Sequence, residues 1–168
     1  VRILHNESKI TFTSKGAVKL LNAETKDLVE RKIDFSNAAV IRPFGNGIKV
    51  GKDAYSANSI RILPYPGTTL GVNGRSYRGE IDIINTGKSL DVINRLELED
   101  HLKGVLPREI NNLWPFSMLK AQAIASRSYA VAQALRRKSK KYDLTADTYS
   151  QVYGGKSDER WRSSRAVD

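Results

Sequence analysis

A long stretch with almost no charge places the strongest constraint on the fold. From Ala121 to Leu135 the only charged residue is Arg127, and small side chains occupy every face of the helix that this stretch predicts. Pro115 and Ser117 are typical of a helix start, and we expect the helix to run to about Arg137. Because a helix that is uncharged on most faces is usually buried, we expect it to be the central element of the fold, packed on most sides.

The first 95 residues follow a different pattern, that of short β-strands separated by turns. Asn73-Gly74 is typical of a tight hairpin turn, because both residues tolerate a positive φ. Polar and apolar residues alternate through one of the expected strands, and a turn is expected at Asn22–Lys26. The expected strands are Arg2–Leu4, Lys9–Thr13, Ala38–Arg42, Ile48–Val50, Tyr77–Asn85 and Leu90–Arg95.

The pattern becomes helical near residue 96. Leu98, Leu102 and Val105 lie on one face of a short helix, which we expect Pro107 to end. The residues from 156 to 168 are charged, and we expect them to be solvated. The sequence therefore predicts a single α+β domain over residues 1–168, with an antiparallel β-rich half (1–95) packed on a long central helix of the helical half (96–168).

Composition narrows the classes of protein further. The chain has 168 residues, enough for one ordinary domain, and a formal net charge of +10, which favours an anionic partner such as nucleic acid, an acidic membrane face or a cell-wall polymer. It has no cysteine, which excludes disulfides and thiolate chemistry. No stretch is apolar over the roughly 18 residues of a membrane span. No signal peptide is visible at Val1, and we expect that any leader was removed.

Glu109 is the most notable carboxylate. It follows the tight apolar segment Gly104 to Pro107, between two expected helices. A partly desolvated carboxyl at such a place would be suited to act as a general acid. The spacing alone favours a plainer interpretation, an exposed Glu109 paired with Arg108.

Two cations and two histidines are the other candidates. Lys120 and Arg127 lie on nearly one face of the long helix, about 10.5 Å apart along its axis. They would hold an anionic polymer or pair with local carboxylates; the spacing leaves both open for Arg127 and favours pairing for Lys120. We expect His5 and His101 to be surface or capping residues rather than ligands or bases.

The helix is followed by a basic run, Arg136 to Lys141. Such a run binds nucleic acid in some proteins, but more often it is a solvated helix end whose cations complement the helix dipole. No nucleic-acid module with interleaved aromatic residues accompanies it. We therefore expect no nucleic-acid partner.

Several motifs in order along the chain resemble the sporulation stage II protein D (SpoIID/LytB) family. The resemblance spans about residues 77–155, and its ordered series of motifs is far more specific than any one of them. The motifs are Tyr77-Arg78-Gly79, Val92 to Asp100, Gly104 to Glu109, Trp114-Pro115, Leu119 to Ala123 with Ala125 to Ala130, and Ser150 to Gly155.

The resemblance implies a lytic transglycosylase of bacterial peptidoglycan that acts outside the cytoplasm on glycan strands stripped of their stem peptides. It implies Glu109 as the catalytic residue and Lys120 and Arg127 as residues needed for activity. We assign Gln151 and Tyr153 to the substrate groove. Some relatives enhance a cell-wall amidase, so a non-catalytic wall-binding enhancer is the alternative function.

The resemblance also bears on cofactors and on the extent of the chain. Some relatives carry a zinc site, but the corresponding positions here are Thr145, Tyr149 and Ser150, which are poor zinc ligands. We therefore expect no metal and no cofactor. Family members continue past the point where this chain stops, so we expect the domain to lack its C-terminal part, and any membrane association to depend on an N-terminal anchor that is missing here.

Overall fold

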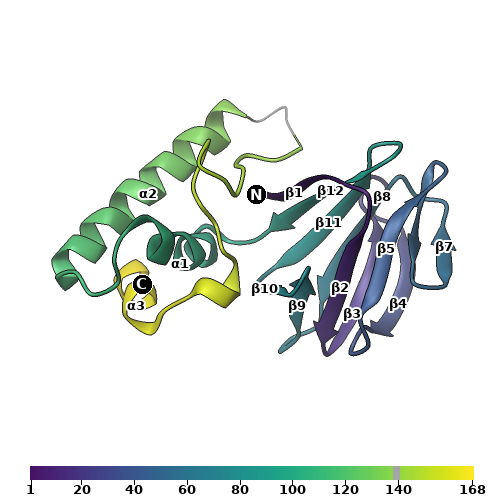
Figure 1. Ribbon diagram of the computed structural model, residues 1–168, viewed down its shortest axis with the longest axis horizontal. Coiled ribbons are helices and arrows are strands. Elements are labelled where there is room, and N and C mark those ends of the chain that lie inside the picture. The colour runs from purple at the N-terminus through teal and green to yellow at the C-terminus, as the bar shows by residue number, and fades with distance from the viewer. Residues whose placement is uncertain (138–140) are drawn as a thin grey trace. The chain divides into compact units, whose positions relative to one another are not determined.

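The computed structural model describes residues 1–137 and 141–168, with the side chain of Arg31 left out. The chain divides into two compact units. The β unit is Ile3–Arg95, and the helical unit is Leu96–Asp168 together with Val1 and Arg2. Figure 1 shows all the strands before residue 96 and all the α-helices after it. The fold class is α+β with antiparallel sheets, as the sequence predicted.

The β unit contains two six-stranded sheets (Figure 1). The neighbouring strands from β12 to β4 in the first sheet, and all neighbouring strands in the second, pair antiparallel. The first sheet has the order β1 (Arg2–Glu7), β12 (Leu90–Arg95), β11 (Glu80–Asn85), β8 (Ser59–Pro64), β3 (Ala17–Asn22) and β4 (Leu28–Asp34). The second has the order β10 (Arg75–Tyr77), β9 (Thr69–Val72), β2 (Ile10–Lys15), β5 (Ala39–Phe44), β6 (Gly47–Val50) and β7 (Asp53–Tyr55).

The turns explain where the expected strands are right and where they are wrong. Asn73 and Gly74 have φ of 47° and 80° and close the β9–β10 hairpin, as predicted. The expected strand Tyr77–Asn85 is instead two strands in different sheets, because Gly79, with φ of 70°, redirects the chain between β10 and β11. Strands β3, β4, β7, β8 and β9 lie outside the expected strand ranges, although the hairpin turn expected at Asn73-Gly74 follows β9 directly.

A buried ion pair lies between two strands of the first sheet. Asp82 on β11 is directly opposite Arg61 on β8, and the guanidinium binds the carboxylate through Nε–Oδ1 (2.6 Å) and Nη2–Oδ2 (2.9 Å). The side chain of Asp82 is only 8% exposed. The hydrogen bond to Asp82 raises the pKa of Arg61, so this guanidinium stays charged within the sheet.

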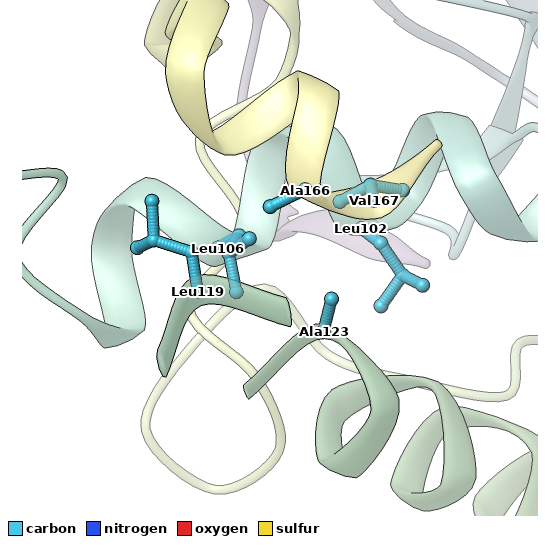
Figure 2. Close-up of a cluster of buried hydrophobic side chains, with 6 residues drawn as sticks. All are labelled: Leu102, Leu106, Leu119, Ala123, Ala166 and Val167. Atoms are coloured by element: carbon cyan, nitrogen blue, oxygen red, sulfur yellow. The ribbon is translucent and has the colours of Figure 1, made fainter. Parts of the chain in front are cut away.

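The helical unit packs three α-helices around a small core. They are α1 (Leu98–Glu109), α2 (Phe116–Arg136) and α3 (Trp161–Val167), with a short 3-10 helix, η1, at Lys156–Asp158. Figure 2 shows the core side chains, which are Leu102 and Leu106 from α1, Leu119 and Ala123 from α2, and Ala166 and Val167 from α3. The expectation that residues 156–168 are solvated is right for most of them, which are exposed or half-buried. It is wrong for Ser163, Ala166 and Val167, which are buried because α3 packs on α1 and α2.

Helix α1 continues past the proline that was expected to end it. Pro107 lies inside the helix, which ends at Glu109. A proline removes one backbone hydrogen bond and crowds the carbonyl four residues before it. Here it lies in the last turn, and Ile110 N still bonds to Leu106 O at 3.2 Å, so the helix is completed around it.

Helix α2 has nearly the bounds that the sequence predicted, but it is not buried on most sides. Only Leu119, Ala123, Ser126 and Ala130 are buried, in one stripe, whereas Ile124 is 62% exposed and Leu135 is 60% exposed. Small residues allow the close contact with α1 and α3, and that contact needs only one face. In the described parts of the chain, no helix has both the length and the apolar character needed to cross a membrane.

Candidate functional site

Two motifs that are distant in sequence meet in the helical unit. The loop Ser150–Gly155 runs across α1, and Gly154 N donates to Gly104 O at 3.2 Å. A Cβ at position 104 would lie 2.5 Å from Cε2 of Tyr153. The helix therefore needs glycine at position 104, because any side chain there would displace the loop.

A buried histidine supports this loop from α1. His101 is 3% exposed; its ring centroid lies 5.0 Å from that of Tyr153, and its Nε2 is 3.3 Å from Gln151 Oε1. Gln151 Nε2 donates to Ser126 O at 3.2 Å, so its Oε1 is the acceptor and His101 Nε2 carries the proton. Burial lowers the pKa of His101 to about 4 and keeps the ring neutral. The expectation of a surface or capping histidine is wrong for His101.

Gln151 and Tyr153 hold the loop in place. Gln151 is 5% exposed and joins α1 to α2 through His101 and Ser126, while Tyr153 is 6% exposed and packs on His101 and Gly104. The sequence predicted that both residues line a substrate groove. In the structure they form the support beneath the backbone of Val152.

Glu109 lies at the C-terminal end of α1, and this loop holds its carboxylate. Val152 N donates to Glu109 Oε1 at 3.1 Å. The residue is exposed, so the partial desolvation that the sequence suggested is absent. The alternative pairing with Arg108 is absent too, because Arg108 binds Asp158. Among the described residues only Val152 donates to this carboxylate, which leaves Oε2 accessible.

The structure separates the two cations of α2. Lys120 is exposed, its Nζ lies 5.2 Å from the ring centroid of Phe116, and no carboxylate of the described residues lies within salt-bridge distance of it. Arg127 is engaged: Nε and Nη2 bind Glu99 at 2.8 and 2.6 Å, and Nη2 also donates to Val167 O at 3.0 Å. Glu109 forms no ion pair with either cation, although its helix packs on α2 through Leu106 and Leu119 (Figure 2).

The Glu99–Arg127 pair has electrostatic consequences for both partners. The hydrogen bond from Arg127 lowers the pKa of Glu99, and the hydrogen bond to Glu99 raises the pKa of Arg127. The pair therefore stays ionised at neutral pH and connects α1, α2 and the end of α3.

No metal centre is apparent in the part of the chain that the structure describes. Among residues 1–137 and 141–168, no three His, Asp or Glu side chains gather as potential ligands. Thr145 Oγ1 instead donates to Asp147 Oδ1 at 2.7 Å, and Tyr149 is 91% exposed. The absence of a metal and of a cofactor stays a prediction.

The basic run is described only in part. Arg136 and Lys141 are exposed, which fits a solvated helix end, while Lys138 and Lys140 lie outside the described residues.

Sequence reasoning missed the residues that support the site from below. His101 falls on the apolar face marked by Leu98, Leu102 and Val105, and this position was the available signal that it is buried. The hydrogen bond from Val152 N and the Glu99–Arg127 pair join residues far apart in the sequence, and no local pattern indicates them.

Comparisons with known proteins identify a family for the helical unit and the residues just before it. Residues 86–168 match the family described as stage II sporulation protein, SpoIID. Residues 86–168, just under half of the chain, are therefore a region of the SpoIID/LytB family. The matched region contains α1, α2 and the loop Ser150–Gly155, so it includes every residue of the candidate site.

Three curated proteins are similar to the chain. It is 32% identical, over all of its length, to an uncharacterized protein of Brachyspira hyodysenteriae, of which it covers 45%. It is 30% identical, over 76% of its length, to a Bacillus subtilis protein named amidase enhancer, of which it covers 16%. It is 27% identical, over 90% of its length, to an uncharacterized protein of Chlamydia muridarum, of which it covers 62%. The chain thus spans less than half of the first two relatives. No solved structure matches it.

Proposed function

We propose that the chain is a lytic transglycosylase that cleaves MurNAc–GlcNAc bonds in peptide-stripped glycan strands of peptidoglycan and produces 1,6-anhydro ends. Membership of the SpoIID family and the similarity to an amidase enhancer support a cell-wall role. The proposal that the chain cleaves the strand is carried by the carboxylate of Glu109, which is held by Val152 N at one oxygen and accessible at the other.

Glu109 acts first as an acid and then as a base. The protonated carboxyl gives its proton from Oε2 to the glycosidic oxygen as the bond from that oxygen to C1 of MurNAc breaks. The resulting carboxylate takes the proton of the O6 hydroxyl of the same MurNAc, and O6 bonds to C1 and closes the anhydro ring. No water is consumed, so this reaction needs no second carboxylate, unlike ordinary glycoside hydrolysis. A bound strand covers Glu109 and supplies the desolvation that the free site lacks.

The cations recognise the acidic groups of the substrate. Strands without peptides expose lactyl carboxylates, and the exposed ammonium of Lys120 binds one of them through a charge-assisted hydrogen bond. The guanidinium of Arg127 is already bound to Glu99. It therefore binds the substrate only if Glu99 accepts fewer of its hydrogen bonds or none. Gln151 and Tyr153 act through the loop, which they hold against α1 so that Val152 N reaches Glu109.

The proposed substrate also sets the place of action and the partners. Peptidoglycan lies outside the cytoplasm, so we place the chain in the periplasm, in the cell wall or at the outer face of the membrane. A cell-wall amidase would remove the stem peptides and so supply the substrate. The name of the Bacillus subtilis relative favours a second candidate function, a non-catalytic enhancer of such an amidase.

Product analysis separates these two functions. The purified chain is incubated with amidase-treated glycan strands, and anhydro-terminated products are measured by mass spectrometry. We expect anhydro products from the wild type, and about a 10²- to 10⁴-fold lower rate from Glu109→Gln, which keeps the shape and loses the proton donor. Glu97→Gln, at the other end of α1, is the matched control and should keep full activity.

Wild-type rates from Glu109→Gln would refute the catalytic assignment. Strand binding without any anhydro product from the wild type would favour the enhancer.

A further inference from the structure

Both tryptophans of the chain are exposed, and both lie in the helical unit. The sequence contains two tryptophans, Trp114 and Trp161, which are 47% and 72% exposed. Large exposed aromatic side chains commonly mark a binding surface, because leaving an indole in water is unfavourable. The candidate site described above uses neither residue.

Hydrogen bonds fasten the segments that carry the two rings to each other. Trp114 is in the loop between α1 and α2, and Trp161 is the first residue of α3. Arg162 Nη1 donates to Trp114 O at 2.6 Å and to Asn112 O at 2.7 Å, and Ser163 N donates to Asn112 Oδ1 at 3.1 Å. The start of α3 is therefore held against the tryptophan loop.

The loop itself is ordered by local hydrogen bonds. Trp114 N donates to Asn111 O at 3.0 Å, and Leu113 N donates to Asn111 Oδ1 at 2.9 Å. Arg165 lies over the Trp161 ring, with Cζ 5.1 Å from the centroid. A surface fixed in this way loses little conformational entropy when a ligand binds.

This surface adjoins the candidate catalytic residue. The loop begins directly after Glu109, five residues before Trp114, and it leads into the first turns of α2, which carry Lys120. On the other side, Arg108, the neighbour of Glu109, binds Asp158 three residues before Trp161. A polymer that occupies Glu109 would therefore pass close to the two tryptophans.

We propose that Trp114 and Trp161 form a sugar-stacking subsite that binds pyranose rings of the glycan strand beside the bond cleaved at Glu109. The proposal rests on the function proposed above. One face of a pyranose ring presents C–H groups, which pack on the negative face of an indole. The sugar hydroxyl and lactyl groups at the ring edges meet Arg165, which lies over the Trp161 ring, and the amides of Asn111 and Asn112 in the loop that carries Trp114.

The chemistry around the rings favours a glycan over a protein partner. Arginines accompany both tryptophans, because Arg162 donates to the carbonyl of Trp114 and Arg165 lies over the Trp161 ring. An acidic sugar polymer combines apolar ring faces with carboxylates, and so it satisfies the indoles and the cations together. A second copy of the chain, with the same positive charge, lacks this complementarity.

Tryptophan fluorescence tests the proposal directly, because the only two indoles belong to the subsite. Peptide-stripped glycan strands are titrated into Glu109→Gln, which should bind without cleaving. We expect the emission to change on binding, also in Trp114→Phe and Trp161→Phe variants, in which one tryptophan remains. Trp114→Ala and Trp161→Ala should each weaken binding about tenfold, the effect of losing one stacked ring.

Phe44→Ala is the matched control, since Phe44 is a 56% exposed aromatic residue of the β unit, and it should bind like its parent. Circular dichroism checks that each variant is folded. Suppose that the parent protein binds strands and that the wild type cleaves them through Glu109. If the emission then stays unchanged and the two alanine variants keep their affinity, the subsite alone is overturned. No binding by the parent protein would overturn the proposed function as well. Emission that changes with protein concentration, together with self-association in sedimentation, would identify the surface as an interface between copies.

Discussion

The β unit and the helical unit use their buried polar side chains differently. The largest fully buried residues of the β unit are aliphatic and aromatic, such as Phe12, Ile62 and Ile83. The helical unit packs its three α-helices around a cluster of leucine, alanine and valine side chains, and it also buries the polar side chains of His101 and Gln151. Both units therefore bury polar side chains, but with different partners. Those of the β unit bind within it, as Asn85 binds Gly47 O and Asp82 binds Arg61, whereas His101 and Gln151 hold a loop at the candidate site.

Each unit also contains a bidentate arginine–carboxylate pair, and the two pairs differ in burial. Arg61–Asp82 lies within a sheet, with side chains 17% and 8% exposed, whereas Arg127–Glu99 lies between helices, with side chains 32% and 46% exposed. Breaking the Arg61–Asp82 pair should therefore destabilise the β unit strongly. Breaking the Arg127–Glu99 pair should destabilise the helical unit only a little, because water screens this more exposed pair.

The largest expected effect follows from breaking the buried pair. Asp82→Ala leaves the Arg61 guanidinium without its main partner inside the sheet, and we expect a loss of about 3–5 kcal/mol in the free energy of unfolding. Hydrogen exchange at the amides of β8 and β11 measures it. Asp27→Ala, at an exposed turn, is the control and should change little. A loss below about 1 kcal/mol for Asp82→Ala would show that the sheet does not depend on this pair.

The next effect is a pH dependence of the helical unit. The pKa of His101 is lowered by burial from 6.5 to about 4, so the unfolded chain binds a proton more readily than the folded one. The associated stability is fully present above about pH 6.5 and is lost as the pH falls towards 4, by about 3 kcal/mol. Tryptophan fluorescence follows unfolding of this unit, because both tryptophans lie in it.

His101→Gln should remove that part of the pH dependence, while His5→Gln, at an exposed histidine of the β unit, should not. Equal pH profiles for His101→Gln and the wild type would contradict the assignment of a buried neutral ring.

A smaller effect is expected from closing the space between α1 and its loop. Gly104→Ala places a Cβ against the Tyr153 ring, and we expect a loss of about 1–3 kcal/mol in the stability of the helical unit. Displacing the loop also moves Val152 N away from Glu109, so anhydro product formation should fall more than glycan binding does. Unchanged cleavage would show that the loop does not position the carboxylate.

The smallest effect belongs to the exposed pair. A double-mutant cycle with Glu99→Gln and Arg127→Gln should give a coupling of about 0.5 kcal/mol. Glycan affinity, measured on the same variants, tests the role of Arg127. If Arg127 contacts substrate, Glu99→Gln frees it and strengthens binding while Arg127→Gln weakens binding. If neither variant changes affinity, Arg127 only joins the helices.

Local patterns predicted the fold class and the long helix well, because periodicity, turn residues and helix starts are local properties. Asn73-Gly74 closes its hairpin and α2 follows Pro115 for this reason. Burial was harder to predict: α2 is exposed on most sides and α3 is packed, since both outcomes depend on which helices meet. The candidate site shows the same limit, because Glu109 was found from its motif, but its contact with Val152 and the support from His101 arise only in the folded unit.

The oxygen atoms in the new strand ends show most directly whether a single carboxylate at the end of α1 cleaves glycan strands without water. The chain is incubated with peptide-stripped strands in water enriched in oxygen-18, and the new ends are analysed by mass spectrometry. Because O6 of the sugar attacks C1, we expect anhydro ends that carry no heavy oxygen. New reducing ends labelled with oxygen-18 would mean hydrolysis and would contradict it.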